Sequence, residues 1–201
     1  MTQVTTAQIV KAITNPRIIN SKKCGPFEVV AKDTGMWTVQ FVNTGTIRTV
    51  VGTYASAGNV VDPYARTVAD VGYIGEGPYG SRIVNQMGAK VKSPAYQLWS
   101  NMLYRCYVDP KNGKRPTYAT CEVHPDWHCF QTFCQDIKQL DGYGAWLAYQ
   151  SGLTGGEKIE LDKDVLCEGM DVKVYGPNTC LFLTKTENLK AMWAARREVQ
   201  A

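Results

Sequence analysis

The spacing of apolar residues changes along this chain, and this change excludes a fold built from one kind of element. Near the N-terminus Trp37, Val39 and Phe41 alternate with the polar Thr38 and Gln40. Such alternation is typical of a strand with one buried and one wet face. Beyond residue 93 the apolar residues recur instead at helical spacing. We therefore expect strands and helices in successive regions.

The first region predicts a small, strongly bent antiparallel sheet or barrel. Strand-like runs occupy residues 27–30, 37–42 and 47–54, with a fourth suggested at 59–62. Asp33-Thr34-Gly35 separates the first two runs as a hairpin turn. Modules of this kind bind nucleic acid or protein, or support a neighbouring domain. The sequence leaves these roles open.

The second region begins with a helix whose first turn is marked by Ser93-Pro94, with serine as N-cap and proline at the first position. A second helix is predicted over residues 125–140 and short strands at 159–162 and 180–183. Thr184-Lys185-Thr186-Glu187 is a capping box for a last helix. On that helix we expect three side chains to face inward, namely Leu189, Met192 and Trp193.

Together these patterns predict an α+β fold. We expect an N-terminal extension at 1–23, a small β-rich module at 24–75 and a basic, glycine-rich linker at 76–92. A helical region that ends in a compact ββα unit follows at 93–201.

Charge is unevenly distributed within a formal net charge of +4. Residues 79–116 hold seven basic groups and one acidic group, whereas residues 117–182 hold four basic and ten acidic groups. A polyanionic partner together with a divalent-cation site would produce this division, because phosphates attract Lys and Arg and hard metals attract carboxylates. The two segments could instead simply attract each other. If the basic segment binds nucleic acid, the residues that contact it are Arg82, Lys90, Lys92, Arg105, Lys111, Lys114 and Arg115.

The seven cysteines are odd in number and no export signal precedes them, so we expect reduced thiols and a cytosolic protein. Cys121, His124 and His128 could form a zinc set with Cys129 or Cys134. His128 and Cys129, however, are adjacent and would point in different directions from a helix. We therefore do not expect zinc.

Several function classes lack their motifs. The chain has no stretch of ~20 apolar residues that could cross a bilayer. It also has no phosphate-binding P-loop and no third glycine to complete a nucleotide fingerprint at Gly75-Glu76-Gly77. A membrane protein, a kinase and a dehydrogenase are thus poor interpretations.

Five segments, in this order, resemble phage-encoded endonucleases of the HNH (His-Asn-His) type. They are residues 71–77 (VGYIGEG), 99–107 (WSNMLYRCY), 161–166 (LDKDVL), 174–180 (VYGPNTC) and Glu187-Asn188. The similarity covers roughly residues 24–195.

The resemblance implies a ββα-metal fold that holds one divalent ion at the scissile phosphate of double-stranded DNA. By position, Asp162 and Asn188 fall on metal-ligating residues. Mg²⁺ or Mn²⁺ suits a carboxylate and an amide oxygen, which are hard ligands. The central asparagine of the family motif falls on Thr179. If phage-encoded, the protein would act in the bacterial cytoplasm.

The family's general base, a histidine, is replaced by Lys163 in this chain. A lysine stays protonated at neutral pH unless burial lowers its pKa by several units, but it could hold a phosphate or stabilise the charge of the transition state. His124 could also serve as a base brought in from elsewhere. Two interpretations therefore stay open: a metal-dependent endonuclease with Asp162, Lys163 and Thr179 at catalytic positions, and a non-cleaving protein that binds nucleic acid or a host protein on the same fold.

Overall fold

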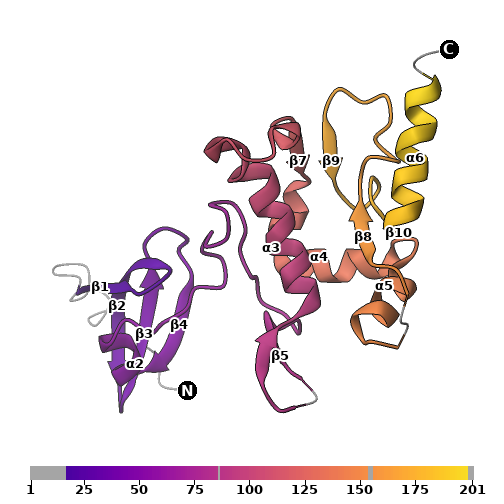
Figure 1. Cartoon of the computed structure of the whole chain (residues 1–201). Helices are drawn as coiled ribbons and strands as arrows, with labels where there is room; N and C mark the ends of the chain where they lie inside the picture. The colour runs from indigo at the N-terminus through magenta and orange to yellow at the C-terminus, as the bar shows by residue number, and fades with distance from the viewer. Residues whose placement is uncertain (1–16, 86, 154–155, 199–201) are drawn as a thin grey trace. The chain divides into compact units, whose positions relative to one another are not determined.

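The computed structural model describes residues 17–85, 87–153 and 156–198. The chain forms two compact units, Met1–Thr67 and Val68–Ala201, and both helices and antiparallel sheets are present (Figure 1). The α+β fold class is therefore confirmed. Among the described residues, no helix combines the length and the apolar character that a bilayer span requires.

The first unit is a four-stranded antiparallel sheet of order β1-β2-β3-β4, followed by a short helix. Its strands are β1 (Ile18–Ser21), β2 (Gly25–Asp33), β3 (Met36–Phe41) and β4 (Ile47–Val51), and its helix is α2 (Gly52–Ser56). The predicted hairpin turn at Asp33-Thr34-Gly35 is confirmed, since Thr34 and Gly35 join β2 to β3 with positive φ angles. Phe27 and Phe41 pack edge to face in the core with ring centroids 5.5 Å apart.

Two strand predictions in this unit were wrong. The strand predicted over residues 47–54 ends at Val51, and α2 begins at Gly52, where the backbone lies so close to the Trp37 indole that an added Cβ would come within 2.5 Å of its Nε1. Residues 59–62 form no strand, because side chains hold them instead of a backbone ladder. Ser21 Oγ donates to the Val60 carbonyl at 2.7 Å, and the buried Asp62 accepts the Tyr64 N–H at 2.9 Å.

Of the N-terminal extension predicted at 1–23, residues 1–16 lie outside the described residues. Ile18–Ser21 pair with β2. The β module was expected to reach residue 75. In the structure Val68 and Ala69 are buried in the core of the second unit, beside Trp99 and Leu103. The module's last residues therefore pack with the helical region.

The residues expected to form a linker contain an antiparallel hairpin, β5 (Arg82–Val84) and β6 (Lys90–Lys92). Just before it, the Gln131 side chain exchanges two hydrogen bonds with the Tyr79 backbone, at 3.0 and 2.9 Å. The start of the segment is thus held against α4 (Phe130–Asp136).

After the hairpin comes α3 (Pro94–Tyr107), where Ser93 Oγ accepts the Tyr96 N–H at 3.1 Å and so confirms the predicted N-cap. Trp99, Met102 and Leu103 of α3 are fully buried in the core of the unit. Trp99 Nε1 donates to the Trp127 carbonyl at 2.7 Å, which satisfies the one polar atom that this ring buries.

The chain then passes through η1 (Pro110–Asn112), η2 (Pro116–Tyr118) and β7 (Cys121–Val123). The single helix predicted over 125–140 is three pieces, η3 (Pro125–His128), α4 (Phe130–Asp136) and η4 (Ile137–Gln139). The break falls at Cys129, which is extended and pairs with Tyr73. The Tyr73 N–H donates to the His128 carbonyl, and the Phe130 N–H to the Tyr73 carbonyl, both at 2.9 Å.

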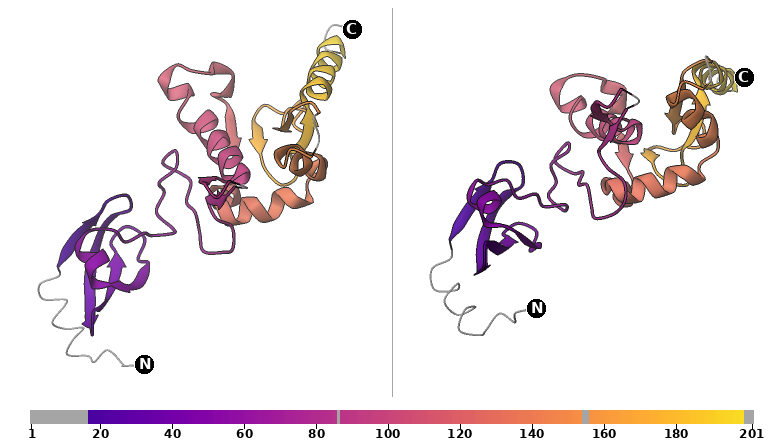
Figure 2. Two further views of the ribbon diagram at one scale, coloured as in Figure 1. Left: turned by 60° about the horizontal axis from the view of Figure 1, so that its bottom comes forward. Right: turned by 90° about the horizontal axis from the view of Figure 1, so that it is seen from below.

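The C-terminal part follows α5 (Tyr143–Gln150) and contains the expected ββα unit. β8 (Ile159–Asp162) pairs antiparallel with β10 (Leu181–Thr184), and α6 (Lys185–Glu198) contacts both strands (Figures 1 and 2). In the chain between β8 and β10, β9 (Lys173–Tyr175) pairs in parallel with β7.

The orientation predicted for the last helix was wrong in part. Leu189 and Trp193 are 39% and 55% exposed, whereas the side chain of Met192 lies outside the described set. Two four-residue strands measure about 13 Å, and a fourteen-residue helix about 21 Å. The sheet is therefore shorter than the helix, and its two strands leave the side chains of Leu189 and Trp193 more than a third exposed.

Gly72 offers a test of how tightly the second unit is packed. A Cβ at this position would overlap Leu103 Cδ1 and lie 2.9 Å from Trp99 Cζ2, while the backbone φ there is ordinary. Gly72→Ala should therefore lower the free energy of unfolding by about 1–3 kcal/mol, measured by urea denaturation. Gly144→Ala is the matched control, because a Cβ there meets nothing within 4 Å and should stabilise α5 slightly. Equal stability of the two variants would contradict this packing.

Candidate metal and phosphate site

One pocket of about 240 Å³ lies in the second unit, against β8. Side chains of α3, η2, α5, β8, β9 and α6 line it, so residues far apart in the sequence meet there. Its charged members are Arg105, Lys158, Glu160, Asp162 and Asp164, and Asn188 supplies an amide. The two residues predicted to hold a metal, Asp162 and Asn188, thus line the same pocket.

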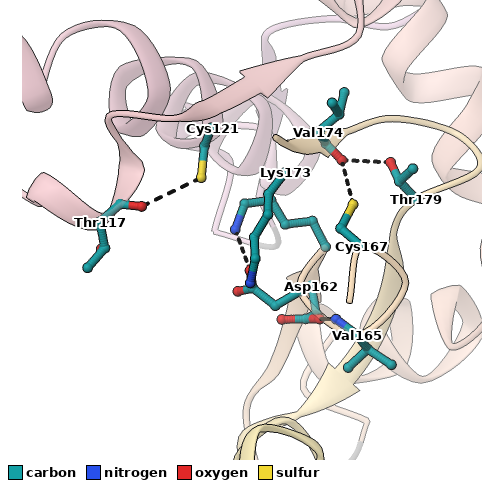
Figure 3. A network of polar contacts seen from close by, with 10 residues as sticks. Thr117, Cys121, Asp162, Val165, Cys167, Lys173, Val174 and Thr179 are labelled. Carbon is teal, nitrogen blue, oxygen red and sulfur yellow. Dashed lines mark hydrogen bonds and ion pairs between the residues drawn. The ribbon is translucent and has the colours of Figure 1, made fainter. Parts of the chain in front are cut away.

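Asp162 is the last residue of β8, opposite Leu181 of β10, and is only 4% exposed. Its Oδ1 accepts the Val165 N–H at 3.0 Å, which turns the chain as the strand ends (Figure 3). Its Oδ2 accepts no hydrogen bond from any residue that the structure describes. Since no fully buried side-chain oxygen in that set lacks a partner, Oδ2 must reach the solvent of the pocket.

Asn188 is held in place by the start of α6. Thr184 Oγ1 accepts the Glu187 N–H at 3.1 Å, and Glu187 Oε2 accepts the Thr184 N–H at 2.8 Å, so the predicted capping box is confirmed. These hydrogen bonds from Thr184 lower the pKa of Glu187. The Asn188 amide is half-buried at the pocket wall and has no hydrogen-bond partner among the described side chains and backbone.

Lys163 does not line the pocket. Its side chain is 4% exposed, and its Nζ lies 2.9 Å from Asp164 Oδ1 and 5.0 and 5.1 Å from the ring centres of Tyr118 and Tyr175. Burial lowers the pKa of Lys163, but the hydrogen bond and the charge of Asp164 outweigh it and leave the pKa raised. The ammonium is therefore charged at neutral pH and accepts no proton.

Asp164 is shared between two lysines. Its Oδ1 also lies 2.7 Å from Lys173 Nζ, and Lys173 is 41% exposed against 4% for Lys163. Burial raises the pKa of Asp164, but the hydrogen bonds from Lys173 and Lys163 have the larger, opposite effect. The pKa of Asp164 is therefore lowered.

Thr179 closes a loop and is not part of the pocket lining. Its Oγ1 donates to the Val174 carbonyl at 2.7 Å, and Cys167 Sγ donates to the same carbonyl at 3.7 Å (Figure 3). These contacts hold together the chain between β8 and β10.

The seven residues predicted to bind nucleic acid divide into two exposed groups of three and one separate residue, Arg105. Arg82, Lys90 and Lys92 are exposed on the β5–β6 hairpin, where alternation places them on one face with Arg82 opposite Lys92. Lys111, Lys114 and Arg115 are exposed around η1 and η2, and Arg115 pairs with Asp109 at 3.2 Å. Arg105 alone lines the pocket.

The histidines have other partners. His128 Nε2 lies 3.0 Å from the Tyr107 hydroxyl, and His124 Nδ1 accepts the Asp126 N–H at 3.4 Å. All seven cysteines are free thiols, as predicted. Within residues 17–85, 87–153 and 156–198, no three side chains of His, Cys, Asp or Glu are grouped to hold a metal. A metal at Asp162 and Asn188 would thus take one carboxylate and one amide oxygen from the protein, a set that suits a hard cation that keeps several waters.

Sequence reasoning did not assign Tyr118, Lys158 and Glu160 to the site, and it placed Arg105 on the basic surface. The place of Arg105 at the site could have been suspected from the sequence, because Arg105 flanks the buried stripe of Met102 and Cys106 on α3. Tyr118 gives no such signal, because its neighbours Lys163 and Tyr175 come from the turn after β8 and from β9.

Comparisons of this chain with protein-family models, with curated proteins and with solved structures find no match. The pocket and its residues are therefore the basis on which a function can be inferred.

Because Lys163 is buried and Lys173 is not, we expect the two lysines that share Asp164 to contribute very differently to the free energy of unfolding. Lys163→Ala should lower the free energy of unfolding by about 2–4 kcal/mol, because it leaves a cavity between two tyrosine rings. Lys163→Met, which keeps most of the volume, should restore most of that loss. Lys173→Ala is the control and should cost less than about 1 kcal/mol, since its ion pair is exposed. Chemical denaturation of the three variants measures this, and equal losses at both lysines would refute the buried role.

Proposed function

We propose that the protein is a metal-dependent DNA endonuclease of the HNH type, with its active site in the pocket beside β8. The observation that carries the proposal is the buried Asp162 carboxylate, which keeps one oxygen open to a pocket that Asn188 also lines. The resemblance of residues 161–166 and 187–188 to that family assigns metal ligation to the same two positions. Geometry and resemblance therefore support one site.

The donor set fits the expected ion. Asp162 and Asn188 offer hard oxygen ligands from β8 and α6 and leave further coordination positions for water and phosphate. When bound, Mg²⁺ or Mn²⁺ would supply a Lewis acid that polarises the phosphate and lowers the pKa of a coordinated water. Hydrogen bonding to Val165 fixes the orientation of the Asp162 carboxylate before any ligand arrives.

Exposed cations of the same unit support DNA as the substrate. Arg82, Lys90 and Lys92 form one positively charged face of a hairpin, and a two-stranded ribbon of this kind can follow a duplex backbone. These residues would position the DNA without reading its sequence.

A second candidate function is binding of nucleic acid or of a host protein without cleavage. The observation that favours it is Lys163, which occupies the position of the family's general base but is buried and charged. His124 does not replace it in the pocket lining, since its side chain packs on Gly176.

The nuclease proposal predicts that cleavage and metal binding depend on the same two residues. Purified protein should nick supercoiled plasmid with Mg²⁺ or Mn²⁺, and Asp162→Ala should reduce the rate at least about 100-fold. Asn188→Ala should weaken Mn²⁺ binding, measured by calorimetry, by about tenfold or more. Asn178→Ala is the matched control, because Asn178 is exposed and does not line the pocket.

Two results would decide between the candidates. Nicking that Asp162→Ala leaves unchanged would point to a contaminating nuclease and overturn the proposal. Salt-sensitive DNA binding with no nicking and no Mn²⁺ uptake would support the non-cleaving alternative.

If DNA binds through the hairpin, removal of the hairpin lysines should reduce the salt dependence of the DNA affinity by a defined amount. Each phosphate contact contributes about 0.9 to the slope of log affinity against log salt. Lys90→Gln/Lys92→Gln should therefore reduce that slope by about 1.8, measured by fluorescence anisotropy on a short duplex. Lys22→Gln/Lys23→Gln removes the same charge from exposed positions of the first unit and should leave the slope unchanged. An equal effect of both pairs would mean that the attraction is not specific to the hairpin.

A further inference from the structure

Arg105 differs from the other residues predicted to bind nucleic acid, because its half-buried side chain lines the pocket. It lies in the last turn of α3, and the neighbouring Tyr118 interacts with its guanidinium and raises its pKa. Burial lowers the pKa of Arg105, but Tyr175, Tyr118 and Glu160 raise it more, so the group keeps its charge.

Most donors of this guanidinium are unused within the protein. A guanidinium has five N–H groups, and among the described residues Tyr118 is the one side chain whose hydrogen bonding acts on the pKa of Arg105. Glu160, the carboxylate whose charge raises the pKa of Arg105, is already bonded to Lys158 at 2.6 Å. Since no fully buried side-chain nitrogen there lacks a partner, the remaining N–H groups reach the pocket.

Tyr118 is itself held by the interior. Burial, and to a smaller extent Tyr118, raise the pKa of Tyr175, so the Tyr175 phenol stays neutral beside Tyr118. The Lys163 ammonium lies 5.0 Å from the Tyr118 ring centre and 5.1 Å from that of Tyr175. A row of contacts thus runs from Lys163 through two tyrosines to the guanidinium.

We propose that Arg105 binds a non-bridging oxygen of a DNA phosphodiester in this pocket, and that Tyr118 is a positioning residue for its guanidinium. The proposal rests on the proposed function in taking DNA as the ligand, but it does not require the metal. The fork of a guanidinium matches two phosphate oxygens. The pocket, at about 240 Å³, is several times larger than the ~30 Å³ share of one water molecule. Glu160 is paired with Lys158, and Asp164 with Lys163 and Lys173. Arg105 therefore mainly offsets the carboxylate of Asp162, which would otherwise repel a phosphate.

The test uses metal-free protein in a chelator and a probe with one phosphodiester, the dinucleotide thymidylyl-thymidine. Phosphorus NMR titration measures its affinity, and so small a probe gains little from the exposed hairpin. Arg105→Gln should weaken binding by about tenfold or more, because charge-assisted hydrogen bonds are lost. Arg105→Lys, which keeps the charge but not the fork, should lose about threefold or more.

Tyr118→Phe keeps the ring and removes the hydroxyl. It should weaken dinucleotide binding about threefold to tenfold and broaden or shift the Arg105 Nε–H signal in proton–nitrogen NMR spectra, with little change in thermal stability. Arg66→Gln is the control, because Arg66 is exposed and does not line the pocket. Its affinity should equal that of the unchanged protein.

Each outcome decides a separate point. The phosphate site is overturned if the dinucleotide shows no saturable binding. It is also overturned if Arg105→Gln and Arg105→Lys, with their folds intact, bind as tightly as the unchanged protein, and Arg105 is then a structural partner of Glu160. Loss in Arg105→Gln without any change in Tyr118→Phe overturns the positioning role. Arg105-dependent binding in a protein that neither takes up Mn²⁺ nor cleaves DNA would refute the proposed nuclease and keep this inference.

Discussion

A buried lysine is the constraint on which the pocket depends. Lys163 directly follows Asp162 at the end of β8, and neighbouring residues of a strand point in opposite directions. Its ammonium is removed from water and is stabilised by Asp164 and by two aromatic rings. A buried charge that loses its partners is strongly destabilising, so this arrangement tolerates little displacement. It therefore holds the Lys163 side chain out of the pocket that Asp162, the residue before it, lines.

The pocket combines groups that would not stay together without this support. Three carboxylates from β8 and the turn after it lie beside cations contributed by α3 and by Lys158. Like charges destabilise one another unless opposite charges or a bound cation balance them. The same arrangement leaves one carboxylate oxygen and several guanidinium N–H groups open to solvent, which suits a ligand that has both a cation and a phosphate.

The resemblance to HNH endonucleases and the structure bear on different questions. The resemblance named Asp162 and Asn188 and drew attention to the lysine in the position of a base. Only the structure places Lys163 away from the pocket, with its pKa raised, and turns Thr179 toward the Val174 carbonyl. At the position that the resemblance gives to a base, the structure therefore has a buried and charged side chain.

Local patterns determined a large part of this protein. The alternation around Trp37, the N-cap at Ser93 and the capping box at Thr184 each depend on neighbours within a few residues, and each appears where the sequence predicts it. The break at Cys129 could not be predicted, because it follows from pairing with Tyr73, more than fifty residues away in the chain. For the same reason only the tertiary structure could bring Arg105 and Tyr118 to the pocket, since long-range packing decides which side chains share a cavity.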